Sequence, residues 1–431
     1  MNGPSFRVRV EPSLRSIAAE TWDACAYATP VGTRSSGAKG FGRLENSGEA
    51  ESKSQRLPLK SEAVESPCEE DDGNPFVTHD FLSSLEESGA AVARTGWLGR
   101  HLLVEDETGA VLAAMPAYLK SHSRGEYVFD HGWAEAFERA GGRYYPKLQV
   151  AVPFTPVTGP RLLVRRGPSA PAAREALIAG ALELVKREEA SSLHVTFPTQ
   201  PEWAYLTGLG FLARNDRQFH WLNQGYRSFD DFLSALSSRK RKMIKRERRE
   251  ALSEGVEILR LSGGDLTEAI WDSFFAFYMD TGSRKWGTPY LNRAFFSIVG
   301  GKMRDKIVLV MAKRAGRFIA GALNFLGRRA IYGRYWGMTE PRAFLHFEVC
   351  YYQAIEYAIE RGLAVVEAGA QGAHKIPRGY RPVTTYSAHH IAHPAFRRAV
   401  ADYLQGERTY VAAEAQELSA ALPFRSEEAE F

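Results

Sequence analysis

A short apolar strand near the C-terminal end of the chain, AVVEA, is followed by a loop of small and polar residues, GAQGAHK. Glu367 and His374 carry side chains that often move protons in enzymes, so either could take the proton of an attacking amine. Lys375 and Arg378 could hold a phosphate or a carboxylate, and Gln371 could help to position the amine and the oxyanion. We therefore expect a cleft at the end of this strand. The alternative is a turn whose polar side chains have no role in a site.

A second carboxylate, Glu348, lies on or beside the apolar face of a helix expected over residues 344–361. Burial would raise the pKa of this carboxyl group, whereas a neighbouring guanidinium such as that of Arg334 would lower it. Its role as a general base or as an anchor depends on which effect is larger. An ion pair that only fixes the helix is the alternative.

The strand expected over residues 332–337 alternates aromatic and polar side chains. Arg334, Tyr335 and Trp336 could therefore line a cleft and stack on a planar ligand, although core filling explains the aromatic residues equally well. The stretch VPFTPVTGPRLL, which begins at Val152, is too rich in proline for a central strand. We expect it to form a rigid loop or a sheet edge, and a stiff connector is the alternative.

The densest charge in the chain lies in SSRKRKMIKRERRE, with eight Lys or Arg and one acid between Arg239 and Arg249. Apolar residues recur beneath the charges at helical spacing, which predicts one docked helix over residues 228–254, capped by Ser228. Because so many like charges repel one another, we expect a phosphate-bearing partner here, and a solvated basic face is the alternative. Six side chains are assigned to the phosphates of this partner: Arg239, Lys240, Arg241, Lys242, Lys245 and Arg246.

The chain of 431 residues has the composition of a globular protein and a net charge of only +4, so the basic helix is a local feature. Cys25, Cys68 and Cys350 are widely separated and have no disulfide or metal spacing. His389 and His393 lie on an expected strand without a carboxylate that could complete a ligand set, so no metal is expected. The chain has no apolar run that could cross a membrane and no secretory leader. We expect a soluble cytoplasmic protein without integral membrane contact.

The order of apolar and polar segments predicts five regions. Residues 1–26 form a strand and a helix that pack on the body, and residues 27–73 are a disordered low-complexity insert. Two related domains follow over residues 74–215 and 216–395, and residues 396–431 form a helical tail. The relation rests on two strand-turn-strand units whose turns at Gly109 and Gly316 have a constant offset. Each unit continues into an aromatic-rich strand, near Trp133 and Trp336, and then a helix and a buried strand. The repeat predicts an α+β fold with two related sheets.

Several blocks of the sequence resemble a known family: NPFVTHDFLSSLEESG, VPFTPVTGPRLL, LSSRKRKMIKRERR, HFEVCYYQAIEYAIERGL and EAGAQGAHKIPRGY. They are similar to the FemAB-like branch of the GNAT superfamily, a group often labelled peptidoglycan biosynthesis or recognition. The resemblance covers Asn74 to about Arg408. It implies tandem GNAT-like domains, each a mixed sheet with flanking helices, and transfer of an acyl or aminoacyl group to an amine. A cell-wall precursor is one candidate for that amine.

The resemblance leaves two donors open, acyl-CoA and aminoacyl-tRNA. The loop GMTEPRAFLHFE lacks the glycine-rich pyrophosphate pattern of acetyl-CoA enzymes, and Glu340 disfavours a phosphate there. The basic helix could instead follow the backbone of a tRNA. A protein of another class, which binds nucleic acid or recognises cell wall without catalysis, is the alternative function.

Overall fold

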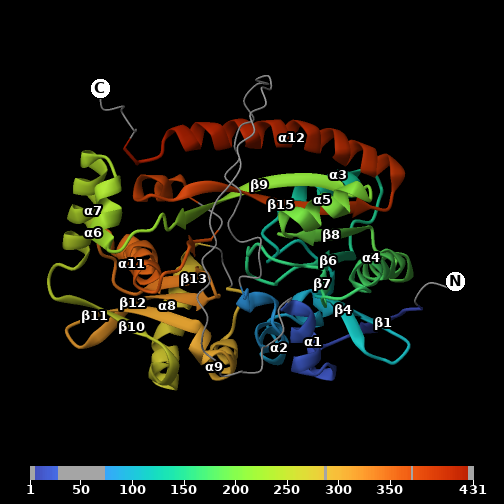
Figure 1. Ribbon diagram of the computed structural model, residues 1–431, viewed down its shortest axis with the longest axis horizontal. Coiled ribbons are helices and arrows are strands. Elements are labelled where there is room, and N and C mark those ends of the chain that lie inside the picture. Colours follow the sequence, from blue (N-terminus) through green and yellow to red (C-terminus); the bar gives the residue numbers. More distant parts are fainter. Residues whose placement is uncertain (1–4, 28–72, 286–288, 370–371, 426–431) are drawn as a thin grey trace, which may run out of the picture.

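The computed structural model describes residues 5–27, 73–285, 289–369 and 372–425. A mixed sheet of eleven strands runs through both halves of the chain (Figure 1). Its strands lie in the order β10 (Val256–Leu261), β11 (Ile307–Arg314), β12 (Arg317–Leu326), β13 (Ala330–Met338), β14 (Val365–Glu367), β9 (Leu212–Leu222), β15 (Arg381–Ile391), β8 (Ser192–Thr196), β6 (Lys147–Val150), β5 (Ala117–Lys120) and β2 (Trp97–Gly99).

A smaller sheet belongs to the first half alone. Its four strands are β1 (Arg7–Glu11), β3 (His101–Glu105), β4 (Val111–Met115) and β7 (Leu163–Val164). Pro116 separates β4 from β5, and because proline has no N–H for a ladder, the chain leaves one sheet and enters the other at this residue.

The expectation of two related sheets is therefore wrong in one respect, because the main sheet is shared by both halves. β9 joins them, since it pairs with β14 of the second half and with β15, which in turn pairs with β8 of the first half. The boundary expected between residues 215 and 216 falls inside β9.

Helices cover both sheets. Those of the first half are α1 (Ala19–Ala26), α2 (His79–Glu87), α3 (His131–Arg139), α4 (Ala170–Arg187) and α5 (Gln200–Gly208). Those of the second half are α6 (Phe229–Ala235), α7 (Ser238–Ala251), α8 (Glu268–Lys285), α9 (Arg293–Lys302), α10 (Leu345–Phe347), α11 (Gln353–Glu360) and α12 (Pro394–Ala420). α12 lies where a helical tail was expected, and it runs as one long rod along β9 and β15 (Figure 1). The insert expected over residues 27–73 lies outside the described residues, except for its two ends.

The repeated hairpins are present in both halves, with left-handed backbone at Gly109 (φ 82°) and Gly316 (φ 78°) in their turns. Trp336 lies on β13, as expected. Trp133 does not lie on a strand: it is buried in α3 against His389, which corrects the expected strand at this place.

The basic segment forms two helices and not the single expected one. Ser228 caps α6, and its hydroxyl oxygen accepts a hydrogen bond from the N–H of Asp231. The helix stops because Leu236 is buried in an extended conformation and pairs with Phe424 from the end of the chain. The N–H of Ser237, the N-cap of α7, donates to the carbonyl oxygen of Pro423 (2.9 Å). A contact distant in sequence therefore divides the segment.

Candidate active site

The candidate site lies where two parallel strands of the main sheet separate. β13 and β14 pair only from Ala330 to Tyr332, after which β14 ends and β13 continues to Met338. A cavity of about 630 Å³ opens between the diverging ends. Its lining includes β13 from Gly333 to Trp336 and, after β14, Ala368. This volume is typical of a small-molecule site.

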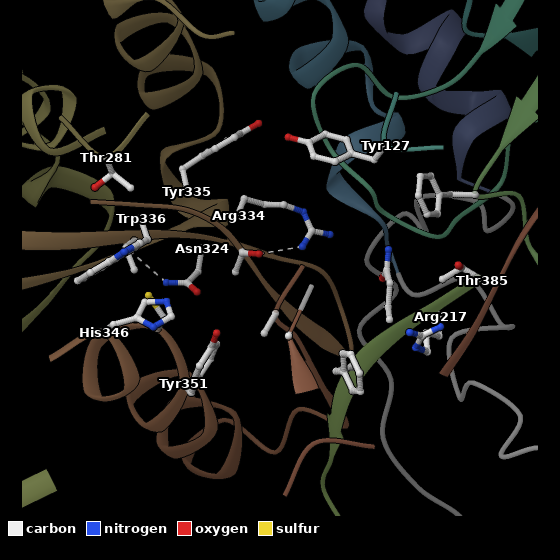
Figure 2. Close-up of a pocket in the computed structure, with 18 of the residues that line it drawn as sticks. Tyr127, Arg217, Thr281, Asn324, Arg334, Tyr335, Trp336, His346, Tyr351 and Thr385 are labelled. Carbon is white, nitrogen blue, oxygen red and sulfur yellow. Dashed lines mark hydrogen bonds between the residues drawn. The ribbon is translucent and has the colours of Figure 1, made fainter. Parts of the chain in front are cut away.

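A β-bulge places Arg334 at the inner end of the cavity. Leu323 of β12 lies opposite Tyr335, and Asn324 lies opposite Gly333, so Arg334 has no residue opposite it. Bulges disrupt the ladder locally and redirect a side chain. The bulge therefore gives β13 a cation that faces the cavity, as Figure 2 shows.

Glu367 fixes this guanidinium. One terminal nitrogen of Arg334 donates to Glu367, and the other donates to the carbonyl oxygen of Gly333 (2.9 Å). Both side chains of the pair are almost fully buried. Nε of Arg334 is buried and has no hydrogen-bond partner among the described residues. Nε is therefore the one nitrogen of the guanidinium that the described chain leaves without a hydrogen-bond partner.

Two further titratable groups surround Glu367. Nε2 of His220 lies 3.8 Å from Glu367, and burial, aided by Arg334, lowers the pKa of His220 to about 3, so the ring is neutral. Burial also lowers the pKa of Lys375 to about 7, and Nζ donates to the carbonyl oxygens of Ala368 (2.7 Å) and Gly369 (3.0 Å). Burial raises the pKa of Glu367 against the opposing pull of Arg334. Neither Glu367 nor Lys375 lines the cavity, so both act from behind it.

Four tyrosines form a wall of the cavity, Tyr127, Tyr278, Tyr290 and Tyr335. The hydroxyl groups of Tyr127 and Tyr335 point toward each other in Figure 2. Burial raises the pKa of Tyr335 to about 12 and that of Tyr278 still further, so both keep their protons. The wall is therefore neutral and polar.

The proline-rich loop lies behind this wall. The hydroxyl group of Tyr335 donates to the carbonyl oxygen of Phe154 (3.1 Å), and the ring of Phe154 stacks on Tyr290. The loop is irregular up to β7, as its prolines predict. It supports the cavity from the first half, although none of its own side chains lines it.

Tyr351 and His374 form a hydrogen-bonded pair at the opposite side. The hydroxyl oxygen of Tyr351 lies 2.9 Å from Nε2 of His374, and Tyr351 lines the cavity. Burial raises the pKa of Tyr351 far above its usual range. Figure 2 shows its hydroxyl group directed into the cavity. The pair thus presents a protonated phenol to a ligand, with an exposed imidazole behind it.

Glu348 and Arg378 are directed away from the cavity, toward α7. Arg248 of α7 holds the carboxylate of Glu348 with two nitrogens (3.0 and 2.9 Å), inside the π-helical turn Glu348–Tyr352. Arg378, in the 3-10 turn Ala373–Arg378, pairs with Glu247 of α7 (2.8 Å). These two ion pairs fasten α7 to elements of the site, and neither residue lines the cavity.

The six cations assigned to phosphates lie on α7 away from these two inward contacts, and none of them lines the cavity. Arg239, Lys242, Lys245 and Arg246 are exposed. Lys245 lies 3.0 Å from Asp230. α7 packs on α10, on the π-helical turn and on the turn of His374, so its charges are one layer from the cavity wall.

Of the residues expected in the site, the cavity brings together Arg334, Tyr335 and Trp336. Gln371 lies outside the described residues. Tyr351 and Asn324 also line the cavity, although neither was expected in the site. Asn324 had a recognisable signal, since it is the one polar side chain in the apolar run FIAGALNFL, where a buried amide needs a reason.

A family model described as peptidoglycan biosynthesis/recognition, FemAB-like, matches residues 60–426. The chain belongs to the FemAB-like family. No curated protein sequence matches the chain. The expected α+β class is confirmed for this FemAB-like protein, because helices pack on an eleven-stranded mixed sheet and on a smaller sheet of four strands.

Three solved structures are among those similar to this chain. FemX shares 14% identity, with a TM-score of 0.49 over 75% of this chain and 93% of that chain. L-PGS from Bacillus licheniformis shares 10%, with a TM-score of 0.45 over 80% and 96%. A tandem GNAT protein from the clavulanic acid biosynthesis pathway shares 14%, with a TM-score of 0.42 over 90% and 99%.

None of the helices in the described ranges is long and apolar enough to cross a membrane. Within the same ranges, no three His, Cys, Asp or Glu side chains gather in a way that could hold a metal ion.

Proposed function

We propose that this FemAB-like protein is an N-acyltransferase that moves an acyl or aminoacyl group from acyl-CoA or aminoacyl-tRNA to an amine. The observation that carries the proposal is the cavity between β13 and β14, where the open N–H of Arg334 and the phenol of Tyr351 both face the ligand space. A hydrogen-bond donor and an acid at one cavity are what acyl transfer to an amine requires. Both donors are cytoplasmic molecules, which favours that compartment.

In the proposed reaction, the nitrogen of a neutral amine attacks the carbonyl carbon of the donor and forms the C–N bond. The carbonyl oxygen becomes an oxyanion, and Nε–H of Arg334 donates to it. Glu367 holds the guanidinium in position through its ion pair. The buried pair is thus a positioning device for the oxyanion donor.

Collapse of the intermediate breaks the bond from the carbonyl carbon to the sulfur or oxygen of the donor. With hydrogen on Nε2, His374 donates to the phenol oxygen of Tyr351, whose own hydrogen is then free to pass to the leaving sulfur or oxygen. The extra proton of the amine passes to solvent, and a proton returns to Tyr351 through His374. The products are an amide and a free thiol or hydroxyl group.

Glu348 is left out of this mechanism, because Arg248 and Gln353 occupy its carboxylate. The basic residues of α7 are proposed to hold the phosphates of the donor next to the cavity. The acceptor we propose to test first is the amine of a cell-wall precursor, in keeping with the description of the family.

A second candidate function is nucleic-acid binding without catalysis. The exposed cations of α7, which do not line the cavity, favour it. Under this alternative, tRNA binds in a salt-dependent manner and no amide forms with any amine.

The proposal is tested with the Tyr351→Phe variant. The protein is incubated with acetyl-CoA or with alanyl-tRNA and a lysine-containing muropeptide, and amide formation is measured by mass spectrometry. We expect wild-type turnover with one donor class and a kcat reduced by about tenfold to a hundredfold in Tyr351→Phe, because the leaving group loses its acid.

The matched control is Tyr118→Phe. Tyr118 is a buried tyrosine of β5 whose hydroxyl group has no partner in the described chain, so its removal should change neither turnover nor stability. Equal turnover of the two variants would exclude Tyr351 as the acid. Absence of product with both donors would exclude the proposed reaction for this acceptor.

A further inference from the structure

Asn324 is a buried amide whose orientation the backbone fixes. The residue is fully buried in β12, and its Nδ2 donates to the carbonyl oxygens of Val308 (3.1 Å) and Ala322 (3.3 Å). Carbonyl oxygens only accept hydrogen bonds, so the NH2 group must face them. Oδ1 therefore faces away from them, and Asn324 lines the cavity.

Oδ1 of Asn324 has no hydrogen-bond partner among the described residues. A buried acceptor without a partner is costly, and one that borders a cavity is completed when a ligand supplies an N–H or O–H. Gly333, opposite on β13, leaves the space next to this oxygen free of a side chain, because a Cβ there would lie 3.3 Å from Oδ1. The pair of Asn324 and Gly333 thus forms an open acceptor for a hydrogen-bond donor.

This acceptor and the unpartnered Nε–H of Arg334 come from neighbouring positions of the bulge, because Asn324 lies opposite Gly333, the residue before Arg334. Two such groups match the intermediate of acyl transfer, in which an oxyanion and an N–H are attached to the same carbon. Arg334 suits the oxyanion, and Asn324 suits the N–H.

We propose that Oδ1 of Asn324 binds the attacking amine and selects primary amines, an inference that rests on the proposed function. The amine donates one N–H to Oδ1, and its lone pair points to the carbonyl carbon of the donor. The nitrogen loses another proton during the reaction, and the N–H on Asn324 remains as the amide N–H of the product. A secondary amine has no hydrogen to keep there, so it forms product more slowly.

The binding step is tested without turnover by 19F NMR. The probes are 4-(trifluoromethyl)benzylamine and its matched methyl ether, 4-(trifluoromethyl)benzyl methyl ether, titrated at a pH close to the pKa of the amine. The ether has the same ring and no N–H. We expect wild-type protein to bind the amine about five- to tenfold more tightly than the ether, which corresponds to one hydrogen bond.

Two variants remove the acceptor in different ways. Asn324→Leu replaces the amide by an apolar side chain of similar size, and Gly333→Ala places a methyl group against Oδ1 without changing Asn324 or its bonds to Val308 and Ala322. Gly333→Ala keeps the test usable if Asn324→Leu does not fold. Both should lose the preference for the amine.

The matched control is Gln149→Leu. Gln149 is a buried amide of the first half whose Oε1 also has no partner in the described chain, but it does not line the cavity. We expect its preference for the amine to equal that of wild type. Equal binding of amine and ether by wild type, or an unchanged preference in Gly333→Ala, would overturn the proposal. Because this readout needs no acyl donor, its failure is distinguishable from the absence of acyl transfer.

Discussion

Among the described residues, each half of the molecule has one pair of parallel strands, and the two pairs end in different surroundings. β6 and β8 pair from Leu148 to Val150, much as β13 and β14 pair from Ala330 to Tyr332. Beyond β13 lies the candidate site. Beyond β6, the chain turns into the proline-rich loop, and the buried side chain of Arg161 fills the space next to the end of β8.

Arg161 fills the first half by binding only backbone. Its guanidinium donates to the carbonyl oxygens of Val157 (2.6 Å), Gly159 (3.0 Å) and Pro160 (3.1 Å) in its own loop, and to that of Thr196 (2.9 Å) at the end of β8. In the second half, Arg334 keeps one N–H open. A similar strand pair thus ends in packed chain where each nitrogen of its arginine is bonded to a carbonyl oxygen, and at a cavity where one nitrogen has no partner in the described chain.

The largest expected effect comes from removing the buried arginine side chain of the first half. Arg161→Met leaves four buried carbonyl oxygens without their donor, and we expect the free energy of unfolding to fall by about 3 kcal/mol or more. Urea unfolding measures this fall. The control is Arg143→Met, because Arg143 and its partner Glu189 are exposed and such pairs contribute about 0.5 kcal/mol. Equal losses in the two variants would mean that Arg161 does not hold the loop.

A smaller effect distinguishes the buried lysines of the two halves. Burial lowers the pKa of both Lys120 and Lys375 to about 7. An unfolded lysine titrates at about 10.4, so between these values the unfolded chain binds more protons than the folded one, and each lysine makes stability rise with pH. Lys375→Met removes one such rise. We expect the variant to be more stable than wild type at pH 6, and this advantage to shrink steadily toward pH 10.

Lys120→Met, the corresponding variant of the first half, allows the two lysines to be compared in the same measurement. Nζ of Lys120 lies 3.6 Å from the buried carboxylate of Glu126 and donates to the carbonyl oxygen of Arg124 (2.9 Å), whereas Nζ of Lys375 donates to two carbonyl oxygens. At pH 6, Lys120→Met removes a cation that this carboxylate stabilises, so its gain in stability over wild type should be smaller than that of Lys375→Met, and both gains should shrink toward pH 10. Unfolding curves at pH 6, 8 and 9.5 measure both. A Lys375→Met advantage that does not change with pH would contradict the lowered pKa.

Local patterns predicted the elements well, because their causes are local. The alternation in residues 332–337 predicted β13, and the cap at Ser228 was placed correctly, since a hydroxyl group next to a helix start acts within one turn. Arg334 was expected in the cleft because it lies on a strand with aromatic neighbours, and it does line the cavity.

What the sequence could not predict depends on contacts between distant segments. The basic helix is broken at Leu236 because Phe424, from the other end of the chain, pairs with it. Glu348 is an anchor because Arg248, one hundred residues away, reaches its carboxylate. The merging of the sheets depends on β9, whose pairing with β14 and β15 has no trace in the repeat itself.

The smallest expected effect tests whether the cations of α7 help to bind the donor at the cavity of the second half. Arg239 and Lys242 are exposed there, and Arg166 and Arg187 are exposed cations of the first half. If α7 holds donor phosphates, replacing Arg239 and Lys242 by Gln should raise the KM for the donor about three- to tenfold at low salt and leave kcat unchanged. The same double replacement at Arg166 and Arg187 should have no effect. The difference between the variants should shrink as salt screens the charges. Equal donor KM values for both double variants would mean that α7 is a solvated basic face, and the cavity would then have to bind its donor without help from that helix.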